Sequence, residues 1–314
     1  MSQTLEWLWD CASAPVLNAL GHRRRPESPG DWPRMWWVPG GALGLLPVHA
    51  SGYHGDPADD PGRRTVMDRV ISSYTPTTRA LRHARARLRA KAGSTSPSTR
   101  SLIVAMPTTP GLPGEGRLHH VRSETAAVSR HLPKHVLLST PDASDCDGSG
   151  PVPPPPAKET VLAHLRECPI AHFACHGVSD SGDPSKSALL LNDWAVSPMT
   201  VADLAALHLD TARMAYLSAC RTAIAYSAGL SDEAIHLASA FQLAGFPSVV
   251  GTLWSIDDRT SVSVADAFYA HLRTDGGLHD TARAAYALHA AVKTVRDRLP
   301  RTPSVWAAYL HVGA

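Results

Sequence analysis

The chain has 314 residues, of which 44% are hydrophobic, so it can form one large domain or two ordinary ones with a sizeable core. Thirty Lys and Arg residues against 28 Asp and Glu give a formal charge of only +2, which offers no general reason to expect a polyanionic partner. No apolar run reaches the length of about 18 residues that a membrane-spanning helix needs, and residues 1–20 lack the basic region of a secretory signal.

The five cysteines have no repeated spacing, which suits a reducing compartment better than a disulfide framework. We therefore expect a soluble, cytoplasmic protein without a membrane partner.

The N-terminal part of the chain has an irregular pattern. Residues 1–20 begin as a helix, 36–53 are apolar and rich in Pro and Gly, 68–74 predict a strand, and 77–91 predict a basic helix. A small, polar stretch at 92–100 then separates this part from the next apolar run. We interpret residues 1–98 as an accessory subdomain packed on a second domain formed by 99–314.

From residue 101 onward, short apolar runs alternate with helical patterns. Strands are predicted at 102–106, 135–139, 170–175, 214–219, 248–256 and 306–313, with a short apolar run at 188–192. Helices are predicted at 123–132, 159–168, 232–245 and over two stretches within 258–297, and Gly245 is placed as a C-terminal cap. This alternation predicts a mostly parallel sheet flanked by helices.

A second break at 139–159 is rich in Pro, Ser, Gly and Asp and predicts an exposed loop. It contains Asp142, Asp145 and Asp147, so cleavage of this loop is one hypothesis for activation. A surface connection without a regulatory role is the alternative.

Two predicted strands end in side chains that can carry chemistry. The strand at 170–175 is followed by His176 and Gly177, and the strand at 214–219 by Cys220. If the two strands are parallel neighbours, imidazole and thiol emerge at the same edge of the sheet. His176 is then a candidate base for a Cys220 nucleophile, and the backbone N–H groups of Gly177 and Cys220 are candidate oxyanion donors.

Plainer interpretations of the same residues exist. Cys220 can be a small buried apolar residue, and His176 can be an ordinary loop histidine. A zinc site formed by His172, Cys175 and His176 is disfavoured, because Cys175 falls on the other face of the strand and no fourth ligand is evident.

Several long motifs, in order, resemble the CHAT domain, a caspase-like (clan CD) family related to separase. They are HFACHG at 172–177, YLSACRTA at 216–223 and DEAIHLASAFQLAGFPSVVGTLWSIDD at 232–258, with similar segments at 32–52 and 306–314. The arrangement matches in outline the caspase pattern of a nucleophilic Cys with its His about 50 residues upstream, although the Gln and final Gly of that motif are absent.

The resemblance implies a three-layer α/β/α sandwich and a cysteine endopeptidase that uses the dyad His176 and Cys220 on a protein substrate, without cofactor or metal. It also implies control by a regulatory or sensor protein in a bacterial stress, defence or cell-death pathway. The rival interpretations are a catalytically silent scaffold with the same fold and a Cys-dependent acyl transferase or esterase.

The residues around the substrate side chain depart from the relatives. Ser218 stands where relatives that prefer a basic P1 residue commonly have Asp, and Ser255 stands where separase-like enzymes have an acid. Asp257 and Asp258 follow closely, and we interpret them as a candidate negative floor for the P1 pocket that favours Arg or Lys. Alternatively, they cap the helix that begins near Arg259.

A basic run links Arg79, Arg82, Arg85, Arg87, Arg89 and Lys91, which can indicate nucleic acid or an acidic partner. Because Leu81, Ala84 and Leu88 repeat beneath it at helical spacing, a solvated amphipathic helix is the favoured interpretation, and no direct nucleic-acid partner is expected.

Overall fold

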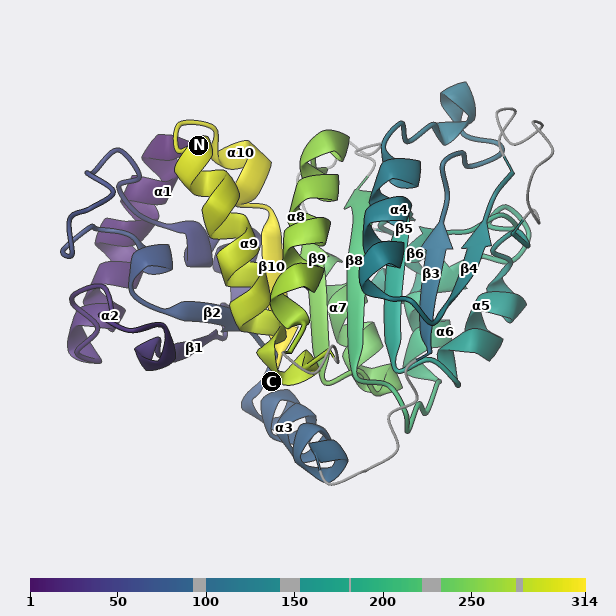
Figure 1. Cartoon of the computed structure of the whole chain (residues 1–314), viewed down its shortest axis with the longest axis horizontal. Coiled ribbons are helices and arrows are strands. Elements are labelled where there is room, and N and C mark those ends of the chain that lie inside the picture. The colour runs from purple at the N-terminus through teal and green to yellow at the C-terminus, as the bar shows by residue number, and fades with distance from the viewer. Residues whose placement is uncertain (93–99, 142–152, 181, 222–232, 275–278) are drawn as a thin grey trace.

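The structure is a computed structural model that describes residues 1–92, 100–141, 153–180, 182–221, 233–274 and 279–314. Within these ranges ten strands form one sheet (Figure 1). The strands are β1 Arg34–Trp37, β2 Ile71–Tyr74, β3 Ser101–Ala105, β4 His135–Ser139, β5 Ile170–Val178, β6 Ala188–Leu190, β7 Met199–Thr200, β8 Met214–Arg221, β9 Ser248–Thr252 and β10 Tyr309–Gly313.

The main path of the sheet runs β1-β2-β10-β9-β8-β5-β3-β4, and β6 and β7 extend from the end of β5. All pairs along this path are parallel except β9 with β10, while β6 is antiparallel to β5 and to β7. This confirms the predicted mostly parallel sheet. The strand predicted at 306–313 is present as β10, but it runs against its neighbour β9.

Helices lie on both faces of the sheet, as the three-layer prediction requires (Figure 1). In the described residues they are α1 Ser2–Leu8, α2 Ala14–Ala19, α3 Thr78–Ala92, α4 Val121–His131, α5 Lys158–Leu165, α6 Val201–Ala205, α7 Glu233–Ala244, α8 Asp258–Leu272, α9 Ala284–Arg298 and α10 Pro303–Trp306, with a π-helical turn at Trp9–Ser13. Helices α4, α8 and α9 cover one face, and α5, α6 and α7 the other.

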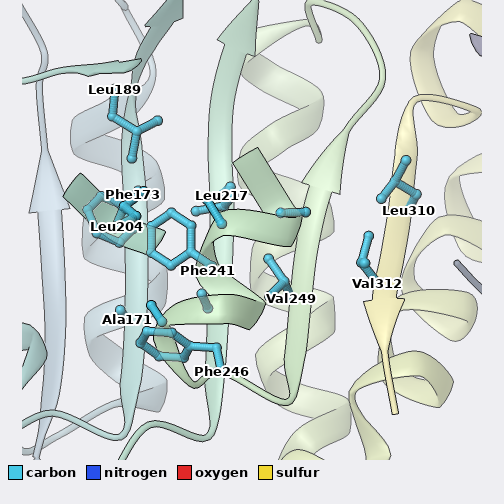
Figure 2. Close-up of a cluster of buried hydrophobic side chains, with 14 of the residues drawn as sticks. Ala171, Phe173, Leu189, Leu204, Leu217, Phe241, Phe246, Val249, Leu310 and Val312 are labelled. Carbon is cyan, nitrogen blue, oxygen red and sulfur yellow. The ribbon is translucent and has the colours of Figure 1, made fainter. Parts of the chain in front are cut away.

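The period of two along β5 sends alternate side chains into two separate cores. Ala171, Phe173 and Cys175 are fully buried on the α7 side, where Phe173 meets Phe241 edge to face (Figure 2). His172 belongs to the opposite side, where it stacks on Tyr216. A nine-residue strand buried on both faces is thereby held in a fixed register, and this positions the residues at its end.

Residues 1–92 add two strands to the same sheet. β2 pairs with β1 and, at one position, with β10, so the last strand joins the N-terminal part to the rest. The boundary between an accessory subdomain and a second domain at 98/99 stays a prediction.

A buried ion-pair network fastens these two parts together. Asp68 lies in the segment just before β2 and is 1% exposed. Both its carboxylate oxygens accept hydrogen bonds from the guanidinium of Arg296 in α9, at 2.7 and 2.9 Å. Thr65 donates to the same carboxylate, and Arg25 and Arg63 lie within ion-pair distance. Burial acts to raise the pKa of Asp68, but its hydrogen bonds and charge interaction with Arg296 outweigh burial and hold that pKa well below its ordinary value.

Some local predictions differ from the structure. No strand was predicted at β1, which overlaps the start of the apolar stretch 36–53, and the short pair of β7 and α6 was also missed. The predicted linker at 92–100 and the loop at 139–159 fall largely on residues 93–99 and 142–152, which lie outside the described residues.

Candidate functional site

His176 and Cys220 lie side by side at the ends of two neighbouring parallel strands. In the register of β5 against β8, His176 is the direct partner of Cys220, and Gly177 is the partner of Arg221. Neighbouring strands are separated by about 4.8 Å, and partners in register occupy the same face of a sheet. The structure therefore brings the two predicted residues together through the backbone.

The imidazole of His176 is fixed by a backbone carbonyl from another loop. Its Nε2 lies 2.8 Å from the carbonyl oxygen of Gly116, and the side chain is only 6% exposed. Because a carbonyl oxygen can only accept, Nε2 carries a proton, and in the neutral ring the lone pair is then on Nδ1. Nδ1 has no hydrogen-bond partner among the described residues. The ring is thus held in the tautomer that can accept a proton at Nδ1.

The turn that presents Gly116 needs glycine. Gly114, Glu115 and Gly116 have φ of 60°, 57° and 53°, a left-handed run that residues other than glycine rarely adopt. A Cβ on Gly116 would come within 2.9 Å of Leu112 Cδ1 and 3.0 Å of Thr109 Cβ. Both the conformation and the space therefore require glycine at 116.

This turn belongs to the connection that follows β3, and the chain order of the sheet explains why it meets His176. β3 lies between β4 and β5, so the chain leaves β3 in one direction toward β4 and later returns to its other side to form β5. Such a reversal leaves a crevice at the carboxyl ends of the strands, where loops from both sides converge. Gly116 and His176 meet at this crevice.

Below His176, a polar cluster joins β5 to the helices on that face. Glu124 of α4 is 2% exposed and accepts a hydrogen bond from Ser261 of α8 at 2.8 Å. Its other oxygen lies 3.2 Å from Nε2 of His172, a close contact without the direction of a hydrogen bond. Nδ1 of His172 lies 3.2 Å from the hydroxyl of Tyr269, whose pKa is raised well above its ordinary value by burial and then by the charge of Glu124.

Sequence reasoning missed Gly116, Glu124 and Tyr269 as parts of the site. The sequence signal for the first is the GEG triplet at 114–116 between a strand and a helix, a composition typical of a turn with positive φ. Nothing local marks the other two, since an acid in the first turn of a helix and a tyrosine among apolar residues are ordinary patterns.

The predicted substrate-side residues have different surroundings. Ser218 is 6% exposed on β8, two positions before Cys220 in the chain. Gly177 has register partners on both sides, Leu189 of β6 and Arg221 of β8. Ser255 is exposed in the turn between β9 and α8.

Asp257 caps α8. Its side chain accepts hydrogen bonds from the backbone N–H and the hydroxyl of Thr260, at 3.0 and 2.9 Å, so the capping alternative describes its contacts. Asp258 is the first residue of the helix. A role of either residue in P1 selection stays a prediction.

The structure separates the residues of the disfavoured zinc site. Cys175 is buried on the α7 side of the sheet, opposite the side on which His172 lies. Across the ranges that the structure covers, no group of three His, Cys, Asp or Glu side chains is placed to hold a metal ion. None of the helices in those ranges is long and apolar enough to cross a membrane.

Solved structures share this architecture. The complex of the pro- and mature domains of RgpB from Porphyromonas gingivalis is 12% identical to this chain, with a TM-score of 0.53 over 97% of this chain and 70% of that one. Separase in its complex with securin from Saccharomyces cerevisiae is 14% identical, with a TM-score of 0.49 over 79% of this chain. This chain covers 14% of the separase chain and 55% of the chain in a structure of gingipain R, so it spans only part of such proteins.

A search of curated proteins gives no match to this chain. The CHAT domain family matches residues 2–314, which is nearly every residue. The sheet order, the helices on both faces and the likeness to RgpB are those of a caspase-like cysteine peptidase fold. The chain belongs to the CHAT domain family.

Proposed function

We propose that this chain is a cysteine endopeptidase in which Cys220 is the nucleophile and His176 transfers the protons. The observation that carries the proposal is the direct pairing of the two residues in register, together with the hydrogen bond from His176 Nε2 to Gly116 O. A thiol beside an oriented imidazole is the arrangement that activates a cysteine for attack on a carbonyl.

The first half of the reaction forms an acyl enzyme. Nδ1 of His176 takes the proton of the Cys220 thiol, and the sulfur bonds to the carbonyl carbon while one electron pair of the C=O bond moves onto oxygen. The backbone N–H groups of Gly177 and Cys220 are the proposed donors to this oxyanion. Because Gly177 has strand partners on both sides, its donor role requires this end of the ladder to open when substrate binds.

The second half releases the products. The oxyanion collapses, the C–N bond breaks, and the imidazolium of His176 gives its proton to the departing amine, which leaves a thioester on Cys220. His176 then takes a proton from water while the water oxygen bonds to the thioester carbon. The C–S bond breaks to release the carboxylic acid, and the imidazolium returns its proton to the sulfur, which restores the thiol. Through both halves Gly116 O keeps the Nε2 proton in place, so the same nitrogen, Nδ1, serves as base and then as acid.

We propose further that the substrate is a specific protein and that a regulatory or sensor protein controls the enzyme. We place the reaction in the cytoplasm of a bacterium, in a stress, defence or cell-death pathway. What supports this part is membership of the CHAT family. For P1, the exposed carboxylate of Asp257 beside the end of β9 supports a preference for Arg or Lys.

Mapping of new protein N-termini tests the function in a form that does not require a known substrate. Cells expressing the wild-type chain with its genomic neighbours are compared with cells expressing Cys220→Ala and His176→Asn. We expect a small set of N-termini that depends on both residues and persists in His119→Asn, a control at an exposed histidine. An identical set of N-termini in all four strains would favour the silent scaffold.

Labelling by an electrophilic peptide ketone tests the nucleophile in the purified protein. Cys11 is exposed and Cys146 lies outside the described residues, so both are replaced by Ser in the background used. Cys168 and Cys175 are buried, and burial raises the pKa of the Cys168 thiol to about 11, so neither competes. We expect stoichiometric labelling that Cys220→Ala abolishes. Labelling without any new N-termini in cells would favour the acyl transferase or esterase.

A further inference from the structure

A groove lies between the basic helix α3 and the C-terminal half of α7. It encloses about 450 Å³, within the range of about 300–1,000 Å³ typical of ligand sites. Its lining includes Arg79 and Arg87 of α3 and Ser239, Gln242 and Leu243 of α7, and we call it the α3–α7 groove.

The groove lies at the opposite end of the sheet from His176. Pro247, which also lines it, immediately precedes the first residue of β9, whereas His176 lies near the end of β5. Figure 1 shows α3 beyond the end of the sheet at which β8 begins. An occupant of the groove therefore leaves the catalytic edge open.

Polar atoms without partners line the groove. Gln242 is 8% exposed, and neither its side-chain oxygen nor its side-chain nitrogen has a hydrogen-bond partner within the described ranges. The same holds for Oγ of Ser239 and Nε of Arg87. Buried polar groups in folded proteins are almost always hydrogen bonded, so a ligand in the groove can supply the partners that these atoms lack.

The chemistry of the unpaired atoms points to a peptide. A primary amide presents one acceptor and two donors side by side, which complements the N–H and C=O of a peptide backbone. Ser239 lies one turn before Gln242 on the same face of α7, so the two side chains follow one line along the groove.

The walls select an acidic, apolar sequence. Helix α3 contains five arginines and no acidic residue, and Arg79 and Arg87 line the groove. Asp210, 4.0 Å from Arg87, is almost fully exposed and screens little of this charge. On the other wall Leu243 is 67% exposed, so an apolar side chain of a ligand can cover it.

Nucleic acid fits these features less well. Nonspecific nucleic-acid binding uses an open basic surface that tracks many phosphates, and sequence readout uses aromatic stacking. This groove instead has an exposed leucine and a buried amide on one wall.

We propose that the α3–α7 groove binds a segment of a partner polypeptide that combines acidic residues with a large apolar side chain. The proposal does not depend on the peptidase activity, because no residue of the dyad takes part.

Selection from a phage-displayed library of random dodecapeptides tests it on the full chain. Selection on the wild type is expected to enrich peptides with Asp or Glu next to Leu, Phe or Trp, and synthetic copies are then measured by fluorescence anisotropy. Arg79→Glu and Gln242→Leu are expected to weaken binding at least about tenfold. Arg82→Glu reverses a charge on the same helix outside the groove and should change binding less than twofold.

Thermal unfolding of each variant is the control for folding: a transition within a few degrees of the wild type establishes that the fold is intact. Leu243→Ser changes an exposed position of the groove and provides a further variant. Four results would overturn the proposal. The first is no enrichment of peptides, and the second is peptide binding that Arg82→Glu weakens as much as Arg79→Glu does. The third is groove-dependent binding of the oligonucleotide dT20 that is tighter than that of the peptides. The fourth is self-association in sedimentation that Arg79→Glu abolishes, since the occupant is then a second copy.

Discussion

Gly116 donates no side chain to the site, yet its carbonyl oxygen, 2.8 Å from Nε2 of His176, decides which nitrogen of that imidazole carries the proton. The contact joins the loop after β3 to the end of β5. Substituting Gly116 therefore tests the proton-transfer role without altering either member of the dyad.

We expect Gly116→Ala to reduce the rate of Cys220 alkylation by the peptide ketone by about 100-fold, the effect of displacing a catalytic group by roughly 1 Å. The added Cβ would clash with Leu112 and Thr109 and push the carbonyl away from His176. Gly114→Ala is the matched control, because it has a similar φ of +60° but nothing within 4 Å of its Cβ. Equal rate losses in both variants would attribute the effect to strain of the turn and count against the positioning role.

Removal of the Glu124 carboxylate is expected to destabilise the fold. Glu124→Ala leaves the buried hydroxyl of Ser261 without its acceptor, and His172 without its neighbouring carboxylate. We expect a loss of about 1–3 kcal/mol in the free energy of unfolding, measured by urea titration. Glu115→Ala, at an exposed position, is the control, and an unchanged midpoint in Glu124→Ala would contradict the prediction.

Breaking the ion pair between Asp68 and Arg296 is expected to destabilise the protein more. Asp68→Asn leaves the fully buried guanidinium of Arg296 with only the partly exposed carboxylate of Asp297 as counter-charge, and loss of the buried partner costs about 3–5 kcal/mol. Asp56→Asn, which removes the partner of a half-exposed Arg64, should cost no more than about 1 kcal/mol. Urea titrations at pH 7 compare the two, and similar losses would refute the assignment.

The same pair predicts a dependence on acid. The folded-state pKa of Asp68 is depressed, so its contribution is complete above the ordinary value of 3.8 and is lost as the pH falls through the folded-state pKa. The difference in stability between wild type and Asp68→Asn should therefore shrink below about pH 4. A difference that stays constant in this range would contradict the prediction.

Buried histidines predict a second loss of stability at milder pH. Burial lowers the pKa of His49, His54 and His289 from 6.5 to about 4, and that of His311 well below 6.5. Below pH 6.5 the unfolded chain takes up these protons and the folded chain does not. Each histidine then removes about 1.4 kcal/mol of stability per pH unit until its folded-state pKa is reached.

We expect the melting temperature to fall steadily from pH 6.5 to pH 4.5. His289→Gln should reduce the slope by about one proton, whereas His119→Gln, at an exposed site, should leave the slope unchanged. A flat curve would show that these rings are accessible to protons in the folded state.

Asp257 allows a test that separates capping from substrate selection. Asn is as good an N-cap as Asp, so Asp257→Asn should keep stability within about 0.5 kcal/mol, whereas Asp257→Ala should lose about 0.5–2 kcal/mol. If the carboxylate also attracts a basic P1 residue, both variants lose the preference for Arg over a neutral residue in the cleaved sites. Better cleavage of neutral P1 peptides by the wild type would end the P1 hypothesis.

The central part of the fold is predictable because its signals are local. The runs at 102–106, 135–139 and 214–219 are apolar and short, and they correspond to β3, β4 and β8 of the structure. Gly245 follows the last residue of α7 with φ of +128°, which confirms the predicted cap. β1 was missed because its two tryptophans lie in a stretch rich in Pro and Gly, where no alternation marks a strand.

The site was predictable only in part, for a related reason. His176 and Cys220 follow apolar runs, so each can be placed at a strand end, but their adjacency depends on which strands pair. The contact of His176 with Gly116 and the pairing of Asp68 with Arg296, 228 residues apart, depend on the completed topology. Local sequence carries no signal for such contacts.

The position of β10 between β2 and β9 has a consequence for biosynthesis. Strands β1 and β2 emerge early from the ribosome, but the strand that connects them to the remainder of the sheet, residues 309–313, is translated after residues 75–308. During that interval β1 and β2 lack their neighbouring strand β10, and pairings between residues so far apart in the sequence slow folding. A nascent chain therefore cannot assemble its full sheet, and with it the frame around a reactive thiol, until those late residues have left the exit tunnel.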